Sequence, residues 1–258
     1  MWKAERMRTT PGARRARSPR RIIAAPLTAL ALAVALTACS GDDAGGGGGG
    51  GGGDEATAED LLADAGDAFG ETSGLQLALT TDDLPEGVTG LSAADGVVTS
   101  APAFEGSITV VLAGNPVQVP VVAVDDVVYA QVPLTPGFQQ VDPAQYGAPD
   151  PAQLLAADGG FVTLLDQTTD LEDSGEERNP DDPSQVLRTV AGTVPGSAVE
   201  SVIPSAEGDF DASYGFEDGE LRSADLTGVF YPDTDPMTYS LRFTDYGTEQ
   251  DITAPAVP

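Results

Sequence analysis

The feature that most constrains this fold is a series of short segments in which apolar and polar residues alternate. Residues 104–112 alternate with a period of two, which places Ile108 and Val110 on the same face of a strand. Residues 117–124 and 127–132 follow after the short turns Gly114-Asn115 and Asp125-Asp126. Because parallel pairing requires long crossover connections, these three segments predict an antiparallel meander.

The last third of the chain repeats this pattern, and helical periodicity is confined to the start and the middle. Strands are expected over residues 210–216, 221–231 and 238–244, with Asp218-Gly219 as a hairpin turn. Thr57 is a suitable N-cap for a first helix that ends near Gly70. Short helices are expected within 150–165 and 197–203, a strand over 187–194, and a solvated acidic loop over 172–182. We therefore expect an α+β fold, with helices against one face of a long antiparallel sheet.

Charge divides the chain into two parts. Eight of the 12 basic residues precede Ile22, whereas 40 of the 41 acidic residues and four arginines follow from Cys39 onward, which gives that part a formal net charge of −36. Such a surface repels nucleic acid phosphates and anionic lipid headgroups, which excludes nucleic acid as a partner and electrostatic docking on a membrane. The acidity is expected to serve solubility, with a high-salt habitat as the alternative.

The N-terminal part has the layout of a secretory signal. An apolar run of 15 residues, 22–36, is shorter than the roughly 20 residues of a spanning helix. It ends in Leu36-Thr37-Ala38-Cys39, which resembles a bacterial lipobox. We expect residues 1–38 to be a signal peptide and Cys39 to be the lipid attachment site, carrying a diacylglyceryl group. The alternative role for a lone cysteine is that of a small buried residue. Arg20-Arg21 leaves general and twin-arginine export both open.

Residues 39–54 are expected to form a flexible tether, and residues 55–258 a single domain. Nine consecutive glycines, 45–53, lie within the tether, and fixing them would cost much conformational entropy. Such a tether has an r.m.s. reach of roughly 20 Å and an extended limit of about 50 Å. Because Cys39 is the only cysteine, no internal disulfide can form.

The residue types present argue against catalysis. The chain has no histidine, which removes imidazole acid–base chemistry and imidazole metal ligands. No phosphate-binding loop, dinucleotide fingerprint or zinc spacing is present. The acidic pairs Asp181-Asp182 and Asp233/Asp235 lack the spacing of a calcium loop. A carboxylate pair remains the one enzymatic alternative, and we predict no enzyme, no catalytic residue, no cofactor and no metal site.

An ordered set of short motifs resembles a known family. The set is Val119-Pro120-Val121-Val122, Asp126 to Ala130, Asp142-Pro143-Ala144, Tyr146 to Pro151, Gly192 to Gly196, Ile203 to Ala206, Leu226-Thr227-Gly228 and Asp245-Tyr246-Gly247. Together these segments resemble the LppX/LprAFG lipoproteins of mycobacteria and related actinobacteria, from about Thr57 to Pro255. The resemblance implies a strongly bent antiparallel half-barrel like that of the LolA carriers, with helices over its concave face and an apolar cavity between.

The resemblance also implies a function. It implies a lipoprotein anchored at the outer face of the plasma membrane, which carries acylated lipids such as triacylglycerol or an acylated glycolipid toward the outer envelope. A major-facilitator-type lipid exporter is the implied partner. The alternative is a structural or interaction lipoprotein of the cell surface with a solid core.

Candidate cavity residues come from the inward faces of the expected strands. They are Ile108, Val110, Val119, Val121, Leu226, Phe230, Tyr239, Leu241 and Phe243. The inward orientation of Val121 follows from its alternation with Pro120 and Val122. Small residues on the same faces, such as Gly106 and Gly228, favour a cavity, and 90–96 suits a mobile lip between early strands.

Overall fold

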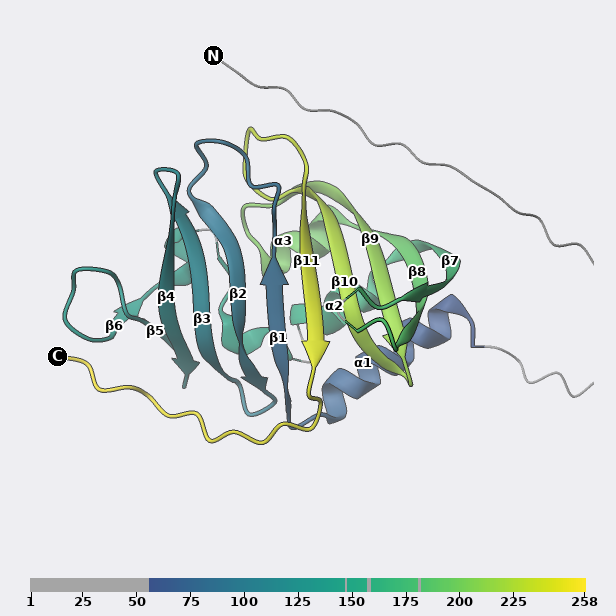
Figure 1. Ribbon diagram of the computed structural model, residues 1–258, viewed down its shortest axis with the longest axis horizontal. Coiled ribbons are helices and arrows are strands. Elements are labelled where there is room, and N and C mark those ends of the chain that lie inside the picture. Colours follow the sequence, from purple (N-terminus) through teal and green to yellow (C-terminus); the bar gives the residue numbers. More distant parts are fainter. Residues whose placement is uncertain (1–55, 147, 157–158, 181) are drawn as a thin grey trace, which may run out of the picture. The chain divides into compact units, whose positions relative to one another are not determined.

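The computed structural model describes residues 56–146, 148–156, 159–180 and 182–258, all within the unit Gly53–Pro258 (Figure 1). The expected signal peptide, Cys39 and the tether lie outside the described residues. The helices are α1 (Ala58–Glu71), α2 (Gly160–Asp166) and α3 (Gly196–Val202), with 3-10 turns η1 (Pro143–Tyr146) and η2 (Pro151–Gln153). The strands are β1 (Gly74–Thr80), β2 (Gly90–Thr99), β3 (Ala103–Leu112), β4 (Asn115–Val124), β5 (Val127–Ala130), β6 (Gln139–Val141), β7 (Thr169–Arg178), β8 (Val186–Val194), β9 (Glu207–Glu217), β10 (Glu220–Val229) and β11 (Met237–Thr244).

These strands form one 11-stranded antiparallel sheet in the order β6-β5-β4-β3-β2-β1-β11-β10-β9-β8-β7. It consists of two meanders, β1–β6 and β7–β11, whose first and last strands meet in the middle of the sheet (Figure 1). The ladder between β1 and β11 runs from Gln76 opposite Thr244 to Thr80 opposite Ser240. This ladder makes one sheet out of two hairpin arrays.

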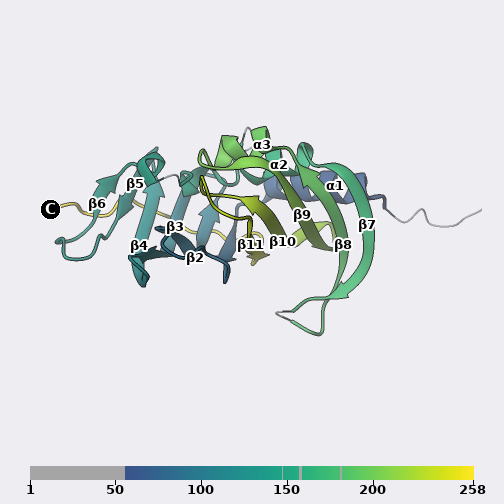
Figure 2. The same cartoon turned by 90° about the horizontal axis from the view of Figure 1, so that it is seen from above.

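The sheet is strongly curved and open, and the helices lie against its concave face (Figure 2). Helices α1, α2 and α3 cover the β7–β11 half, whereas η2 packs over β2, β3 and β4. Register shifts within the β2–β3, β7–β8 and β9–β10 ladders accompany the bend, since bulges increase local twist. The predicted α+β half-barrel is therefore confirmed.

Helix α1 begins where its sequence predicts. The Thr57 hydroxyl accepts a hydrogen bond from the Asp60 amide, and the Asp60 carboxylate accepts one from the Thr57 amide, so the two form a capping box. The Asp60 carboxylate accepts hydrogen bonds from both the amide and the hydroxyl of Thr57, and these two bonds hold the pKa of Asp60 below its usual value. Leu61, Leu62, Ala65 and Phe69 form the buried face of the helix, which turns its apolar stripe toward the sheet.

Phenylalanine rings fill the space that strand glycines leave on the concave face. A Cβ added to Gly106 or Gly96 would lie 2.8 or 2.7 Å from Cζ of Phe104. A Cβ added to Gly228 would lie 2.3 Å from Cδ1 of Phe210. These glycines therefore make room for aromatic rings and do not by themselves mark an empty cavity.

Two local predictions differ from the structure. The acidic stretch 172–182, predicted as a loop, largely belongs to the edge strand β7, whose side chains are nearly all exposed. With no apolar alternation, its strand character comes only from pairing with β8. Residues 90–96, predicted as a mobile lip, lie within β2, which pairs with β3 from Gly90 onward and with β1 from Ala93 onward.

The C-terminal segment covers part of the convex face. Ile252 packs in a small apolar cluster with Ala103, Val122 and Tyr129. Gln250 donates a hydrogen bond of 2.7 Å to the Glu105 carboxylate. A strap of irregular chain therefore buries the part of the convex face of β3–β5 that surrounds Val122.

We predict that Gly228→Ala destabilises the fold because the new methyl group would displace the Phe210 ring. Overpacking of this kind typically lowers the free energy of unfolding by about 1–3 kcal/mol, measurable by urea denaturation. The matched control is Gly66→Ala on α1, where an added Cβ meets nothing within 4 Å. That change should stabilise the helix by roughly 0.5–1 kcal/mol. Equal stabilities for the two variants would contradict the ring packing described here.

Candidate functional site

The candidate site is the apolar layer between the concave face of the sheet and the helices. One continuous cluster of buried side chains extends from α1 through the sheet to β8 and β9. At its centre, the Phe69, Phe161 and Phe243 rings come from α1, α2 and β11, with centroids 5.0 Å apart for Phe161 and Phe243 and 5.3 Å for Phe69 and Phe243. The helices thus hold to the sheet through edge-on aromatic contacts above the β1–β11 seam.

A second aromatic group lies near the other end of the seam. The Phe230 ring makes edge contacts with the Phe210 and Tyr239 rings, at centroid distances of 4.8 and 4.7 Å. The Tyr239 hydroxyl donates to the Leu91 carbonyl, and the Tyr231 hydroxyl accepts from the Leu91 amide. The two tyrosines thereby connect β11 and the loop before it to β2 across the end of β1.

The nine predicted residues all lie on the concave face, in two groups. By strand register, Ile108 pairs with Val119, and Val121 pairs with Gly106, which places the β3–β4 group on that face. Val110 is half-buried near the end of the same face. The β10–β11 group, Leu226, Phe230, Tyr239, Leu241 and Phe243, is fully buried in the apolar cluster. Strands β1 and β2 separate the two groups, so they do not form one compact pocket.

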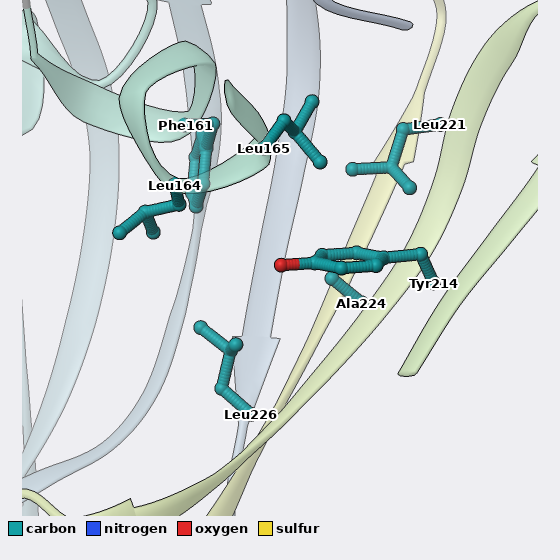
Figure 3. Close-up of a pocket in the computed structure, with 7 residues that line it drawn as sticks. All are labelled: Phe161, Leu164, Leu165, Tyr214, Leu221, Ala224 and Leu226. Atoms are coloured by element: carbon teal, nitrogen blue, oxygen red, sulfur yellow. The ribbon is translucent and has the colours of Figure 1, made fainter. Parts of the chain in front are cut away.

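The apolar layer is nearly filled. A hollow of about 10 Å³ remains between α2 and strands β9 and β10. Its walls are Phe161, Leu164, Leu165, Tyr214, Leu221, Ala224 and Leu226 (Figure 3). Sites for small molecules occupy about 300–1,000 Å³, so this hollow holds roughly one water-sized sphere and no acyl chain. The cavity predicted between sheet and helices is thus closed in this structure.

Helix α2, which forms one wall of the hollow, is fixed near its start by a hydrogen bond of 3.0 Å from the Phe161 amide to the Leu154 carbonyl. It has seven residues and no side-chain cap. Gly159 precedes the helix and Gly160 is its first residue, and their φ angles are +127° and +59°. A Cβ on Gly160 would lie 2.3 Å from the Leu154 carbonyl oxygen, so glycine is required there.

The other end of α2 is fixed to the sheet. The Thr168 hydroxyl donates to the Leu164 carbonyl and lies 2.9 Å from the Tyr214 hydroxyl. Burial raises the pKa of Tyr214 to about 12. The polar atoms at this wall are therefore paired, and the wall presents apolar surface to the hollow.

The described residues contain neither a metal-binding cluster nor a helix that could span a membrane. No group of three or more acidic or cysteine side chains is placed to hold a metal ion within 56–146, 148–156, 159–180 and 182–258. None of the helices among these residues is long and apolar enough to span a membrane. The chemistry available in the layer is burial of apolar groups.

Sequence patterns identified the strand residues of the layer but missed the residues that line the hollow. Leu226 alone appears in both sets. Phe161, Leu164 and Leu165 form an apolar stripe at helical spacing directly after Gly159-Gly160, and this stripe is the sequence signal that could have identified the wall of the hollow.

Comparison with known proteins supplies the family. A model of the LppX_LprAFG lipoprotein family matches residues 57–254. The chain is similar in structure to LprF from Mycobacterium bovis, with a TM-score of 0.62 and 17% identity over 78% of this chain and 97% of LprF. It is also similar to the lipoprotein LppX from Mycobacterium tuberculosis, with a TM-score of 0.56 and 16% identity over 76% of this chain and 98% of LppX. No curated protein sequence matches the chain significantly.

We predict that the free energy of unfolding falls as the pH rises from about 10 to about 12. An unfolded tyrosine ionises near 10, whereas Tyr214 in the fold ionises at about 12. Above pH 10 the unfolded state therefore loses a proton that the folded state retains, which favours unfolding. Burial also raises the pKa of Tyr239 and Tyr246, which contribute to the same pH dependence. Tyr214→Phe should therefore reduce this dependence without abolishing it, measured by urea denaturation at a series of pH values. An unchanged slope would show that Tyr214 is accessible to solvent in the fold.

Proposed function

The chain belongs to the LppX/LprAFG lipoprotein family, and on this premise we propose that it binds acylated lipids and carries them from the plasma membrane toward the outer cell envelope. Family membership implies a membrane-anchored protein of the cell envelope. The half-barrel fold, shared with LprF and LppX, supports the proposal. The observation that carries it is the continuous apolar layer between a curved sheet and short helices.

The domain organisation is part of this proposal. Residues 1–38 act as a signal peptide, and Cys39 carries the lipid that anchors the chain to the outer face of the plasma membrane. Residues 39–54 form the tether. The helix α1 then begins the lipid-binding domain, residues 55–258.

Binding of a lipid requires the layer to open. The hollow of about 10 Å³ is far too small for an acyl chain. Outward movement of α2 about Gly159-Gly160 would separate Phe161, Leu164 and Leu165 from the Tyr214 wall. Each methylene group buried against these walls would contribute about 0.8 kcal/mol, which offsets the packing that α2 gives up against the sheet. The bound lipid thus replaces side-chain packing with acyl-chain packing.

The cargo class follows from these walls. Apolar side chains on both sides suit a ligand with several acyl chains, such as a triacylglycerol or an acylated glycolipid, with its headgroup at the rim. The protein performs no reaction on the lipid. A major-facilitator-type exporter in the plasma membrane would supply it.

A second function is favoured by one observation, the nearly filled interior. A lipoprotein whose layer stays closed would act as a structural or interaction protein of the cell surface. Close packing of this kind is what a solid core requires.

We predict that Val121→Trp reduces the amount of bound lipid per folded protein at least several-fold. The side chain of Val121 lies on the concave face, opposite Gly106 and Ala130, so the indole would occupy the part of the apolar layer into which acyl chains must extend from the α2 wall past β1 and β2. Because the layer is filled, stability should also fall by about 1–3 kcal/mol. Native mass spectrometry of tether-free protein from a lipid-producing host measures the lipid, and thermal melting measures stability.

The matched control is the adjacent Val122→Trp. Val122 is equally buried but lies on the convex face, against Ile252. This variant should lose similar stability and keep its lipid. Wild-type protein free of lipid, and unable to take up an added acylated lipid, would decide for the structural lipoprotein.

We also predict that Cys39→Ser leaves the precursor unprocessed at this site or releases the protein from the membrane fraction. The serine hydroxyl cannot replace the thiol that accepts the diacylglyceryl group. Membrane fractionation and mass spectrometry of the purified chain measure the outcome. Equal apparent mass and equal membrane association of wild type and variant would refute the lipobox assignment.

A further inference from the structure

The loop 131–138, between β5 and β6, holds its apolar tip away from the rest of the domain. Leu134 is 106% exposed and adopts a left-handed backbone conformation with φ at +70°. The amide and hydroxyl of Thr135 both donate to the Val132 carbonyl, at 3.2 and 2.7 Å. These hydrogen bonds close the turn and hold Leu134 in solvent. A loop without them could fold the leucine side chain back onto the sheet.

The C-terminal segment adds to the same edge of the sheet. Gly137 lies beside Pro258, since a Cβ there would be 3.7 Å from the proline Cδ. Val257 is 49% exposed and Val132 is 37% exposed. Val132, Leu134 and Val257 thus gather around one loop, and we refer to these three residues as the edge patch. Of the described residues, only Leu112 and Val186 are further large exposed hydrophobics.

Charge is absent around the edge patch. Residues 127–141 and 252–258 contain no charged side chain, in a chain with 41 acidic residues. The meander 90–141 carries four acidic residues, whereas the segment 169–244 carries 17. A surface of anionic headgroups would repel the β7–β11 half and would admit the β4–β6 edge.

The edge is poorly suited to pairing with another strand. Strand β6 has only three residues, and the last hydrogen bond of β5 to β4 runs from the Gln131 amide to the Pro120 carbonyl. Beyond this bond β4 has no partner on its β5 side. The backbone groups of every second residue point toward that open edge, and these residues are Pro120, Gln118 and Pro116. Two of these three positions have no N–H to donate, which blocks strand addition by a second copy. An occupant that needs no directed hydrogen bonds, such as a lipid surface, fits this edge better.

We propose that the edge patch enters the headgroup region of the membrane to which the chain is tethered. The inference rests on the proposed function, in which the chain is anchored to the membrane. Burial of one leucine side chain improves partitioning of a protein from water into the membrane only roughly 10- to 100-fold, which is too little without an anchor. Helix α1, where the tether joins the domain, lies at the β7–β8 end of the sheet (Figure 1), so the tether of about 15 residues must extend toward its limit of about 50 Å for the edge patch to reach the bilayer. Docking through the edge patch keeps the acidic half of the sheet away from the headgroups.

The experiment uses the chain from Cys39 onward, since the described fold lies within Gly53–Pro258. Its single cysteine is coupled to a maleimide lipid in phosphatidylcholine vesicles, which fixes the anchor chemically and makes the test independent of lipid processing. Because Trp2 is the only tryptophan, Leu134→Trp creates a single fluorescent reporter. The control is Val186→Trp at the start of β8, where the native side chain is 45% exposed.

For Leu134→Trp on vesicles we expect a blue-shifted emission and quenching by brominated phosphatidylcholine. Val186→Trp should keep the emission of the free protein and resist the quencher. Added phosphatidylglycerol should weaken the signal of Leu134→Trp at low salt, and salt should restore it.

Two results would overturn the proposal. In the first, the Leu134→Trp protein on vesicles has the same emission maximum and the same weak quenching as the Val186→Trp protein. The other is a blue shift without vesicles that grows with protein concentration, which would assign the edge patch to a second copy of the chain. Thermal melting checks that both variants are folded, and uptake of an added acylated lipid separates failure here from failure of the proposed carrier function.

Discussion

The β1–β11 ladder is the contact on which the rest of this structure depends. Each meander closes through short turns between neighbouring strands, but only this ladder joins the first strand to the last. Hydrogen bonds reinforce both ends of the seam. At one end the Tyr239 hydroxyl reaches the Leu91 carbonyl, and at the other the Gly247 amide donates to the Thr72 hydroxyl. Because its strands come from opposite ends of the domain, this ladder carries the largest loop-closure cost.

The helices pack against the β1–β11 ladder, and this packing stabilises the ladder. Phe243, on β11, contacts the rings of Phe69 and Phe161 from two different helices. Leu77 lies opposite Phe243 in the ladder and extends the same apolar surface. The seam and the helix layer therefore stabilise each other. Opening of the layer by α2 can leave α1 in place over the seam.

The closed interior is compatible with the lipid-carrier proposal if the side chains of α2 and the acyl chains of a bound lipid pack against the same apolar surface of the sheet. Side chains of α2 occupy the space that acyl chains would take, so the empty protein avoids exposing a large apolar cavity to water. The glycines of the concave face serve a similar end, since the rings of Phe104 and Phe210 cover them. Acidic residues are concentrated on the β7–β11 half, whereas residues 127–141, which include β5 and β6, carry no charged side chain. The two halves of one sheet are thus suited to different surroundings.

The sequence alone determined the features that depend on near neighbours in the chain. Period-two alternation placed Val121 inward and Val122 outward, and Thr57 with Asp60 set the start of α1, because side-chain direction and capping are local properties. Tertiary structure decided the rest. Residues 169–178 are a strand only because β8 supplies a partner, and the glycines are filled because a phenylalanine on the same or a neighbouring strand lies above them. The size of the hollow beside Tyr214 depends on how α2 meets β9 and β10, and Leu134 forms a patch only because the C-terminal segment lies beside its loop. Each of these features joins segments distant in the sequence, and no local pattern encodes which distant surfaces will meet.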